Sequence, residues 1–345
     1  MAQVQYHGII DPSNGCFHFH PGRPRFNTRV PESEDDSTLM TIPPSVLDTW
    51  TNQGSTSNSS DTYSSVQRAI ENGRYGLENE DFDHSYDIHL QGSYANYTNI
   101  YGTSDVDIVV RVTMPFQEDL EDLNLGEKNR FWDNYQDLDY DWEDFYSRVE
   151  RALRGYFGRD ALEIGDKAIK VNSESTGAIS KDADIVPAAD YRKYSEFPED
   201  GDEVYDTGMY FKTQTTGRPI VNYSKIHREK GSDKNDLADQ NYKPTIRMIK
   251  NAAKHAINRG YLSDDAVSSY YLEGLLYNVP NSIFKQSDLQ DRYLDIIEWL
   301  QNADLGDLPE QSEMYPLCQW GDPDRWTVSN AEATVEALEK FWDDY

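Results

Sequence analysis

The chain has 345 residues, of which 37% are hydrophobic, so it is long enough for one large domain or two packed domains and can bury a core. That composition excludes wholesale disorder, and no apolar run approaches the roughly 18 residues of a membrane span. The formal net charge of -30 argues against non-specific binding to DNA or RNA, because an acidic surface repels polyanions.

The same charge leaves two interpretations open: a protein of a salt-rich cytoplasm, whose carboxylates hold water and cations, or a protein with one acidic face. The start, MAQVQYHGIIDPSNG, lacks the basic and apolar regions of an export signal, so we expect a cytoplasmic protein without a membrane partner. Cys16 and Cys318 then favour two free thiols over a disulfide. His18 and His20 beside Cys16 lack the further ligands that a zinc site needs.

The first third of the chain predicts an arm, a helix and two strands. Residues 1–60 are rich in Pro, Ser, Thr, Asn and Asp, which is typical of irregular structure. A helix is expected from about residue 61, where apolar residues begin to recur at helical spacing. SYDIHLQG (85–92) predicts a strand that ends in a Gly-Ser turn, and DVDIVVRVT (105–113) predicts a second strand. Residues 117–147 contain eleven acidic and two basic side chains and predict a solvated insertion.

The middle of the chain continues with one helix and several strands. These elements are a helix in EDFYSRVERALRGYFG (143–158), strands in KAIKVN (167–172) and DADIVPAADY (182–191), and a hairpin around TTGRP (215–219).

From about Tyr242 onward the pattern is helical. Strands first and helices later predict an α+β fold, with a catalytic lobe at 61–222 packed on a helical lobe at 223–345.

Two aspartates at the start of the second strand require a counter-charge. Side chains on a strand alternate faces, so Asp105 and Asp107 point the same way, while Val106, Ile108 and Val110 point to the opposite, buried face. Like charges this close raise each other's pKa unless a cation neutralises them. Two Mg²⁺ ions, or Mn²⁺ in their place, satisfy such oxygen ligands, and a pair of such ions is the standard device for nucleotidyl transfer.

A third carboxylate is expected from another strand, and KDADIVPAA offers Asp182 and Asp184. We favour Asp184, because the IVP that follows it resembles the IVV after Asp107 and places it where the strand is buried. Gly92 and Ser93 precede the pair by a spacing that accommodates a short helix and a turn, and Gly lets backbone approach a phosphate closely.

In this order and spacing, the residues resemble the polymerase-β-like nucleotidyltransferase superfamily, whose pattern is Gly-Ser, a spacer, Asp-x-Asp and a later Asp. More narrowly, GSYANYTNIYGTSDVDIVV is similar to the CD-NTases, the cGAS/DncV-like nucleotidyltransferases. The similarity continues in DIVPA, YKPTIRMIKN and SYYLEGLLYNVP, and covers about residues 87–280. It implies a catalytic lobe with a mixed sheet, and a cyclic di- or trinucleotide signal made from nucleoside triphosphates in anti-phage defence of the CBASS type.

The resemblance also implies roles for single residues. The three aspartates Asp105, Asp107 and Asp184 would hold two Mg²⁺ ions, and Gly92 and Ser93 would hold the β- and γ-phosphates of the donor nucleotide.

In the helical lobe, the resemblance implies that Lys250 would neutralise the donor triphosphate. Ser269 and Tyr270 would contact the nucleotide, and Tyr270 would stack on the base.

The pattern of the helix that begins near Lys243 supports Lys250 independently. Its basic residues recur on one face, at Lys243, Arg247, Lys250 and Lys254. A basic face in so acidic a chain is a local exception that a triphosphate would explain. The alternative for this face is an ordinary solvated stripe, and the alternative for Tyr270 is packing in the core.

Three hypotheses for the function remain open at this point. The first is a cyclic nucleotide synthase that takes nucleoside triphosphates and has a regulatory protein of a defence operon as a possible partner. The second keeps the chemistry but transfers the nucleotide to a protein, a small molecule or an RNA end, and the net charge weighs against RNA. The third is a nucleotide-binding sensor, against which the complete set of aspartates argues.

Overall fold

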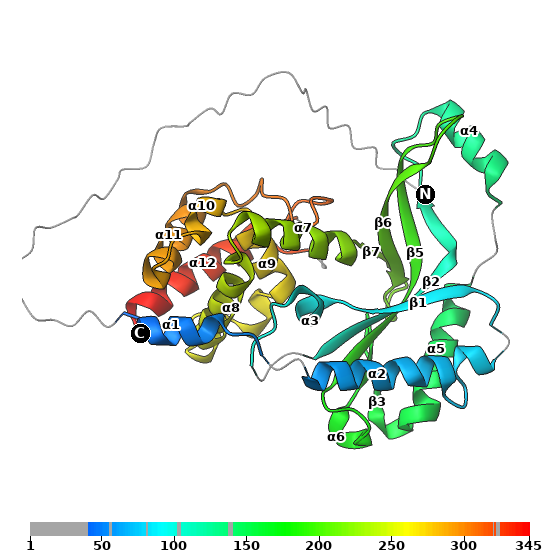
Figure 1. Ribbon diagram of the computed structural model, residues 1–345, viewed down its shortest axis with the longest axis horizontal. Helices are drawn as coiled ribbons and strands as arrows, with labels where there is room; N and C mark the ends of the chain where they lie inside the picture. Colours follow the sequence, from blue (N-terminus) through cyan, green and yellow to red (C-terminus); the bar gives the residue numbers. More distant parts are fainter. Residues whose placement is uncertain are drawn as a thin grey trace, which may run out of the picture. The chain divides into compact units, whose positions relative to one another are not determined.

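The computed structural model describes residues 41–54, 57–80, 82–101, 105–136, 141–319, 321 and 325–345. Residues Met40–Tyr345 form one compact unit, and the arrangement of its helices and strands is drawn in Figure 1. No helix in the part of the chain that the structure describes is long and apolar enough to cross a lipid bilayer. The predictions for Cys16, His18 and His20 lie outside the described residues, and Cys318 is a buried free thiol.

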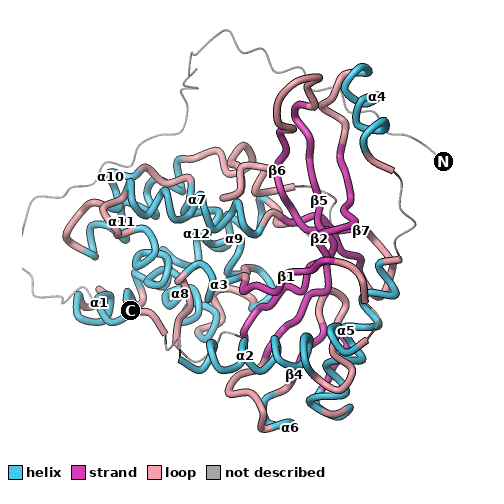
Figure 2. Tube along the Cα trace, turned by 45° about the vertical axis from the view of Figure 1, so that its right-hand side comes forward, coloured by secondary structure: helices cyan, strands magenta, loops and turns pink. Residues whose placement is uncertain are grey.

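The strands form one seven-stranded mixed sheet in the described part of the chain. β1 pairs antiparallel with β2, β2 pairs parallel with β5, and β5 pairs antiparallel with both β4 and β6. β3 lies beyond β4, and β7 lies beyond β6; the long central strands β2 and β5 run side by side in Figure 2. The strands are β1 (Ser85–Leu90), β2 (Val106–Asp119), β3 (Leu162–Ile164), β4 (Ile169–Val171), β5 (Ala183–Glu196), β6 (Val204–Lys212) and β7 (Pro219–Asn222).

The helices fall into two groups around two hydrophobic cores. The first core joins the sheet to helices of the N-terminal half, and the second is made by helices and the loops between them, without a strand of the sheet. The helices are α1 (Pro44–Thr51), α2 (Ser57–Asn72), α3 (Gly92–Asn96), α4 (Leu125–Asn134), α5 (Trp142–Phe157), α6 (Ser173–Thr176), α7 (Ser224–Leu237), α8 (Tyr242–Asn258), α9 (Ser269–Tyr277), α10 (Asn281–Phe284), α11 (Leu289–Asn302) and α12 (Val328–Asp343), with single 3₁₀ turns at Leu77–Asn79, Arg159–Ala161 and Asp264–Ala266.

The sheet core follows from the spacing of apolar residues. α2 and α5 both carry apolar side chains three and four residues apart, which is one face of a helix. These side chains pack with the valines and isoleucines of β2 and β5. The fold prediction of an α+β protein with a mixed sheet and a helical part is therefore confirmed, and α2 begins at Ser57, earlier than the predicted start at 61.

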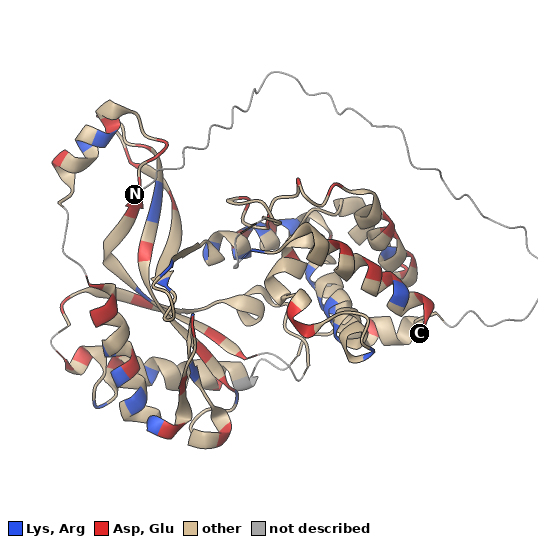
Figure 3. Ribbon diagram, turned by 180° about the vertical axis from the view of Figure 1, so that it is seen from behind, with Lys and Arg blue, Asp and Glu red and all other residues tan. Residues whose placement is uncertain are grey.

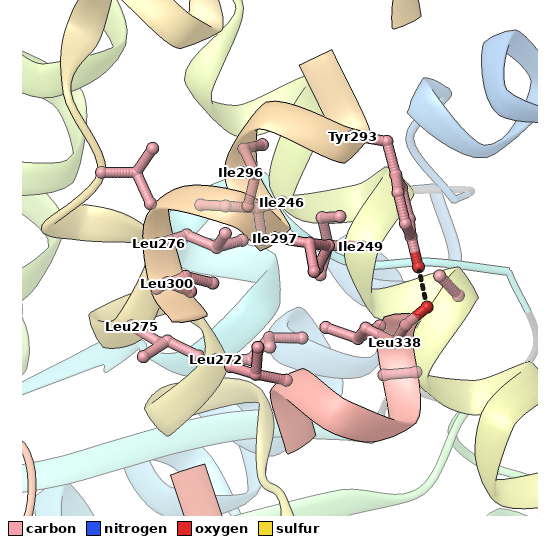
Figure 4. Close-up of a cluster of buried hydrophobic side chains, with 14 of the residues drawn as sticks. Ile246, Ile249, Leu272, Leu275, Leu276, Tyr293, Ile296, Ile297, Leu300 and Leu338 are labelled. Atoms are coloured by element: carbon pink, nitrogen blue, oxygen red, sulfur yellow. Dashed lines mark hydrogen bonds between the residues drawn. The ribbon is translucent and has the colours of Figure 1, made fainter. Parts of the chain in front are cut away.

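The helical core contains α8 at its centre. Ile246, Ile249, Ala253 and Ala256 of α8 are buried and recur at helical spacing. Side chains of α9, α11 and α12 pack around them, and Figure 4 shows Tyr293 of α11 among these side chains. The Tyr293 hydroxyl donates to the backbone oxygen of Leu338 at 2.9 Å, so this buried polar group is satisfied.

Two predictions about irregular segments are wrong. Residues 44–51, assigned to the irregular arm 1–60, form the helix α1, which contacts α8 and α11 and places the buried Leu47 in the helical core. A proline at the first helical position starts this helix without needing a backbone N–H there.

The predicted insertion 117–147 is not simply solvated either. β2 continues to Asp119, and α4 places Phe131 in a small third core with Tyr194 and Phe197.

The acidic residues are spread over several elements. In Figure 3, Asp and Glu lie on strands of the sheet and on helices of both groups.

Candidate active site

The Gly-Ser turn approaches Asp107 closely. β1 ends at Leu90, and α3 begins at Gly92, whose φ of 64° is in the left-handed region. A Cβ at this position would lie 2.1 Å from Asp107 Oδ2, so only glycine fits here. The backbone N–H of Gln91 donates to the backbone oxygen of Asp107 at 3.0 Å, and this bond fixes the turn against β2.

The sheet places two of the three aspartates side by side on neighbouring strands. Asp107 in β2 and Asp184 in β5 are direct partners in the parallel ladder. Asp105 lies just before β2, and the N–H of Val106 donates to the backbone oxygen of Asp182 at 2.9 Å. Val106, Ile108 and Val110 are fully buried on the opposite face. The predicted burial of Val106, Ile108 and Val110 is confirmed, and Val109, on the face of Asp107, is buried as well.

These carboxylates disfavour one another's charge. Burial raises the pKa of Asp107 to about 7, and the negative charges of Asp184 and Asp105 contribute to that rise. Burial also raises the pKa of Asp184, again with a contribution from Asp105. Among the described residues, no ion pair joins Asp107 or Asp184 to a basic side chain.

The other two acidic groups at this edge do have partners. Lys170 Nζ lies 2.7 Å from Asp105 Oδ2, and it lies 3.5 Å from Asp182 Oδ2. Asp182 Oδ1 accepts from the backbone N–H of Ser173 at 2.8 Å and from its hydroxyl at 2.7 Å, which lowers the pKa of Asp182. Asp182 is therefore engaged elsewhere, and this supports the choice of Asp184 as the third carboxylate.

The three aspartates fit a hard divalent cation, because their carboxylates are suitable ligands and the pairing of β2 with β5 places Asp107 beside Asp184. Asp107 and Asp184 are two half-buried carboxylates that form no ion pair with a basic side chain in the described part of the chain, and Asp105 lies two residues before Asp107. Carboxylate oxygens are the donors that Mg²⁺ prefers. The side chains do not yet converge: within the described ranges, no three acidic, histidine or cysteine side chains are arranged as one metal-binding group. Asp105 is instead bonded to Lys170, whose ammonium donates to its Oδ2.

A pocket of about 410 Å³ brings most of the predicted site residues together. Its wall comes from the α3 turn, the start of β2, the end of β7 with α7, and the start of α9. The lining residues are Gln91, Gly92, Ser93, Asn96, Asp105, Asp107, Asn222, Ser224, His227, Ser268, Ser269, Tyr270 and Glu273. Six of the eight predicted site residues are in this set, and Asp184 and Lys250 are not.

Lys250 faces a buried glutamate. Its Nζ lies 2.5 Å from Glu273 Oε1 and 3.1 Å from the hydroxyl oxygen of Thr98, and its side chain is 5% exposed. The alternative that this lysine belongs to a solvated stripe is therefore wrong. Arg247 donates to the backbone oxygens of Thr51 and Tyr97, so part of the predicted basic face binds protein groups.

Glu273 is the main residue that sequence reasoning missed. Besides Lys250 and Thr98, its carboxylate accepts from Asn96 Nδ2 at 2.8 Å and lies 3.1 Å from His227 Nε2. Burial alone would raise the pKa of Glu273, but the charge of Lys250 and the contact with His227 lower it below its usual range. The one available signal was an acidic residue inside the apolar run YYLEGLLY.

Tyr270 is held by two contacts that the sequence did not reveal. Its ring stacks on His227 with centroids 4.7 Å apart, and its hydroxyl donates to Glu310 Oε2 at 2.8 Å. His227 Nδ1 and Asn222 Oδ1 are buried without a hydrogen-bond partner in the described part of the chain. Both belong to pocket-lining residues, so a nucleotide is the kind of ligand that could supply the missing partners.

Comparison with known proteins gives concordant matches. The family described as cGAS/DncV-like nucleotidyltransferase C-terminal helical domain matches residues 229–343. A cyclic UMP-AMP synthase from Rhodothermus marinus is 36% identical over 304 residues, which are 88% of this chain and 98% of that protein. The cyclic nucleotide synthase CdnE01 from Staphylococcus haemolyticus is 33% identical over 312 residues, with coverages of 89% and 100%.

A solved structure of one of these relatives is also similar to this protein in fold. The structure of the Rhodothermus marinus CdnE c-UMP-AMP synthase with Apcpp and Upnpp aligns with a TM-score of 0.76 over 88% of this chain and 97% of that one, at 36% identity.

The protein has a mixed sheet in which an Asp-x-Asp at the start of one strand meets an Asp on the parallel neighbour, beside a Gly-Ser turn and a helical part. This combination defines a polymerase-β-like nucleotidyltransferase. Within that class, the chain belongs to the CD-NTase family, the cGAS/DncV-like nucleotidyltransferases. It is an enzyme, a cyclic nucleotide synthase of the nucleotidyltransferase class.

Proposed function

We propose that the protein joins nucleoside triphosphates into a cyclic di- or trinucleotide, with two Mg²⁺ ions held by Asp105, Asp107 and Asp184. The observation that carries this proposal is the pairing of Asp107 with Asp184 across two parallel strands, beside a pocket that the Gly92–Ser93 turn borders. When bound there, Mg²⁺ lowers the pKa of an attacking hydroxyl and neutralises the leaving pyrophosphate.

The residues of the chain have separate roles in each transfer. Ser93 and the backbone at Gly92 hold the β- and γ-phosphates of the donor. A ribose hydroxyl oxygen of the acceptor bonds to the donor α-phosphorus, the bond from that phosphorus to pyrophosphate breaks, and the hydroxyl proton passes to Asp184. A further transfer within the same pocket closes the ring and releases another pyrophosphate.

The two remaining predicted contacts concern the nucleotide base and the donor charge. Ser269 and Tyr270 lie at the start of α9, on the wall of the pocket, where Tyr270 presents a ring fixed by His227 and Glu310. Lys250 lies behind Glu273, so it acts on a bound triphosphate through its charge, which already lowers the pKa of Asp107.

The biological setting that we propose is CBASS-type anti-phage defence in the cytoplasm, with a regulatory protein of the same operon as partner. Family membership and the full set of aspartates support it. Transfer to an RNA end is disfavoured by the net charge of -30, because polyanions are repelled. A nucleotide-binding sensor would not need Asp107 and Asp184 as direct partners on neighbouring strands, with Asp105 two residues before Asp107.

The test is to incubate the purified chain with the four nucleoside triphosphates and Mg²⁺ or Mn²⁺, and to analyse the products by mass spectrometry before and after phosphatase treatment. We expect pyrophosphate and a phosphatase-resistant product with the mass of a cyclic nucleotide. Asp107→Asn, which keeps the size of the side chain, serves as the control and should give neither. Phosphatase-sensitive products alone would contradict ring closure.

A further inference from the structure

A lysine continues the row of aspartates across the sheet. Asp107 in β2 is the direct partner of Asp184 in β5, and Asp184 is in turn the direct partner of Lys170 in β4. Side chains of directly paired residues on neighbouring strands project from the same face of a sheet. Lys170 therefore lies on the face that carries the aspartates, and the transfer reaction proposed above makes no use of it.

The ammonium of Lys170 reaches the remaining aspartate of the proposed metal site. Its Nζ lies 2.7 Å from Asp105 Oδ2 and 3.5 Å from Asp182 Oδ2. Asp182 is itself fixed, because its Oδ1 accepts from the backbone N–H and from the hydroxyl of Ser173. The lysine is thus held between an anchored carboxylate and a carboxylate of the proposed metal site.

The ion pair distinguishes Asp105 from the other two aspartates. In the part of the chain that the structure describes, ion pairs join Asp105, but neither Asp107 nor Asp184, to a basic side chain. The acidic, histidine and cysteine side chains of the same residues form no metal-binding group of three. The carboxylate that a divalent ion needs from Asp105 is therefore already bonded to a single positive charge.

A metal ion that binds Asp105 must compete with this ammonium in one of two ways. If the ion takes Oδ2, the bond to Lys170 breaks. If the ion takes the other carboxylate oxygen, it lies close to the ammonium. A single and a double positive charge about 5 Å apart lower an affinity by on the order of tenfold even at the dielectric constant of water. In both cases the charge of Lys170 weakens the binding of the metal.

We propose that Lys170 is a built-in counter-ion of the metal site, which neutralises Asp105 in the metal-free protein and competes there with the divalent ion. It thereby sets the metal concentration at which the aspartates are filled. This inference rests on the proposed function, since it needs the aspartates to bind metal. A lysine that only oriented Asp105 for the metal would have the opposite effect, because its loss would weaken metal binding.

The test measures the binding of Mn²⁺ to the nucleotide-free protein, from the electron paramagnetic resonance signal of the unbound ion. Lys170→Gln removes the charge, and Lys170→Met is a second uncharged variant of similar length. Lys170→Arg keeps the charge. Asp107→Asn, titrated in parallel, gives the binding of Mn²⁺ to the rest of this acidic protein.

Lys212 in β6 and Glu143 in α5 form a matched control pair. Their Nζ to Oε1 distance is also 2.7 Å, and their side chains are 29% and 59% exposed, compared with 33% and 39% for Lys170 and Asp105. Neither is among the described residues that line the catalytic pocket. Lys212→Gln therefore removes the same charge from a similar ion pair outside the site. Thermal melts in EDTA verify that all variants are folded.

We expect Lys170→Gln and Lys170→Met to lower the Kd for Mn²⁺ by several-fold to about tenfold, because the competing charge is gone. Lys170→Arg and Lys212→Gln should leave this Kd within about twofold of the wild type, since the first keeps the charge and the second lies elsewhere. The Mg²⁺ concentration that gives half of the maximal pyrophosphate release should fall in the two uncharged variants as well.

A Kd for Mn²⁺ that is unchanged or raised in both uncharged variants overturns the proposal. If the wild type binds Mn²⁺ no more tightly than Asp107→Asn does, the metal site itself is refuted, and the proposed function fails with it. The two failures are therefore distinct.

Discussion

The buried pair of Lys250 and Glu273 offers a quantitative test of how the helical part supports the active site. The side chains are 5% and 2% exposed, and the Nζ to Oε1 distance is 2.5 Å. Removing one partner of such a pair leaves an uncompensated buried charge, which costs about 3–5 kcal/mol. Lys250→Met should be at the low end, because Glu273 keeps donors from Thr98 and Asn96. Glu273→Gln should be at the high end, because it leaves the buried ammonium with neutral acceptors, the new amide oxygen and Thr98, and without the carboxylate charge.

Combining the two substitutions removes both charges and should restore part of the loss. We expect the double variant to be more stable than the sum of the single effects by about 2–3 kcal/mol, the upper range for groups in direct contact. The free energy of unfolding is measured by urea denaturation in EDTA, followed by circular dichroism. Lys230 and Glu313 form a matched control pair, also 2.5 Å apart but 38% and 45% exposed, for which the coupling should stay below about 1 kcal/mol.

Additive losses within about 0.5 kcal/mol for the buried pair would refute the reasoning, because independent sites behave in that way. The same four proteins also test the predicted action of Lys250 on the donor triphosphate. If Lys250 acts on the nucleotide as well as on Glu273, the affinity for a non-cleavable triphosphate with Mg²⁺, measured by calorimetry, stays low in the double variant although stability recovers.

Three further predictions concern the pocket. Because the pKa of Asp107 is raised from 3.8 to about 7, its charge opposes folding, and this cost develops between about pH 4 and 7. Asp107→Asn should therefore stabilise the metal-free protein at pH 8 by up to about 4 kcal/mol and make its melting temperature depend less on pH. Equal melting temperatures of both proteins at pH 8 would contradict this prediction. Ser93→Ala should raise the KM for the donor by roughly tenfold, the loss of one hydrogen bond to a charged group, in steady-state assays of pyrophosphate release. Tyr270→Phe keeps the ring and should change the nucleotide KM little, whereas Tyr270→Ala should raise it several-fold; equal effects of both would exclude stacking on the base.

The sequence predicted the parts of the site that depend on local order. Alternation along a strand is a property of the backbone, so Asp105 and Asp107 could be assigned to one face, and the buried Val106 to the other. The glycine requirement at Gly92 could also be predicted, but its observed cause is the approach of Asp107. The pairing of Asp107 with Asp184 needed the additional inference that their strands are neighbours.

The features that the sequence did not predict depend on contacts between residues that are distant in the chain. α7 was not recognised as a separate helix, because its buried positions are polar or small, such as His227 and Lys234, and leave no apolar stripe. Glu273 binds groups from α3, α7 and α8, and no pattern within α9 indicates them. The same contacts explain why Lys250 pairs with Glu273 and does not line the pocket.

The central claim is that Asp105, Asp107 and Asp184 together hold divalent ions next to a bound triphosphate. The most direct measurement is a crystal structure of the protein soaked with Mn²⁺ and a non-cleavable nucleoside triphosphate, in which anomalous scattering locates the metal. We predict peaks in contact with oxygens of all three aspartates, with Asp105 turned away from Lys170. Bound nucleotide without a metal peak at these carboxylates, and with Asp105 still paired to Lys170, would contradict the account.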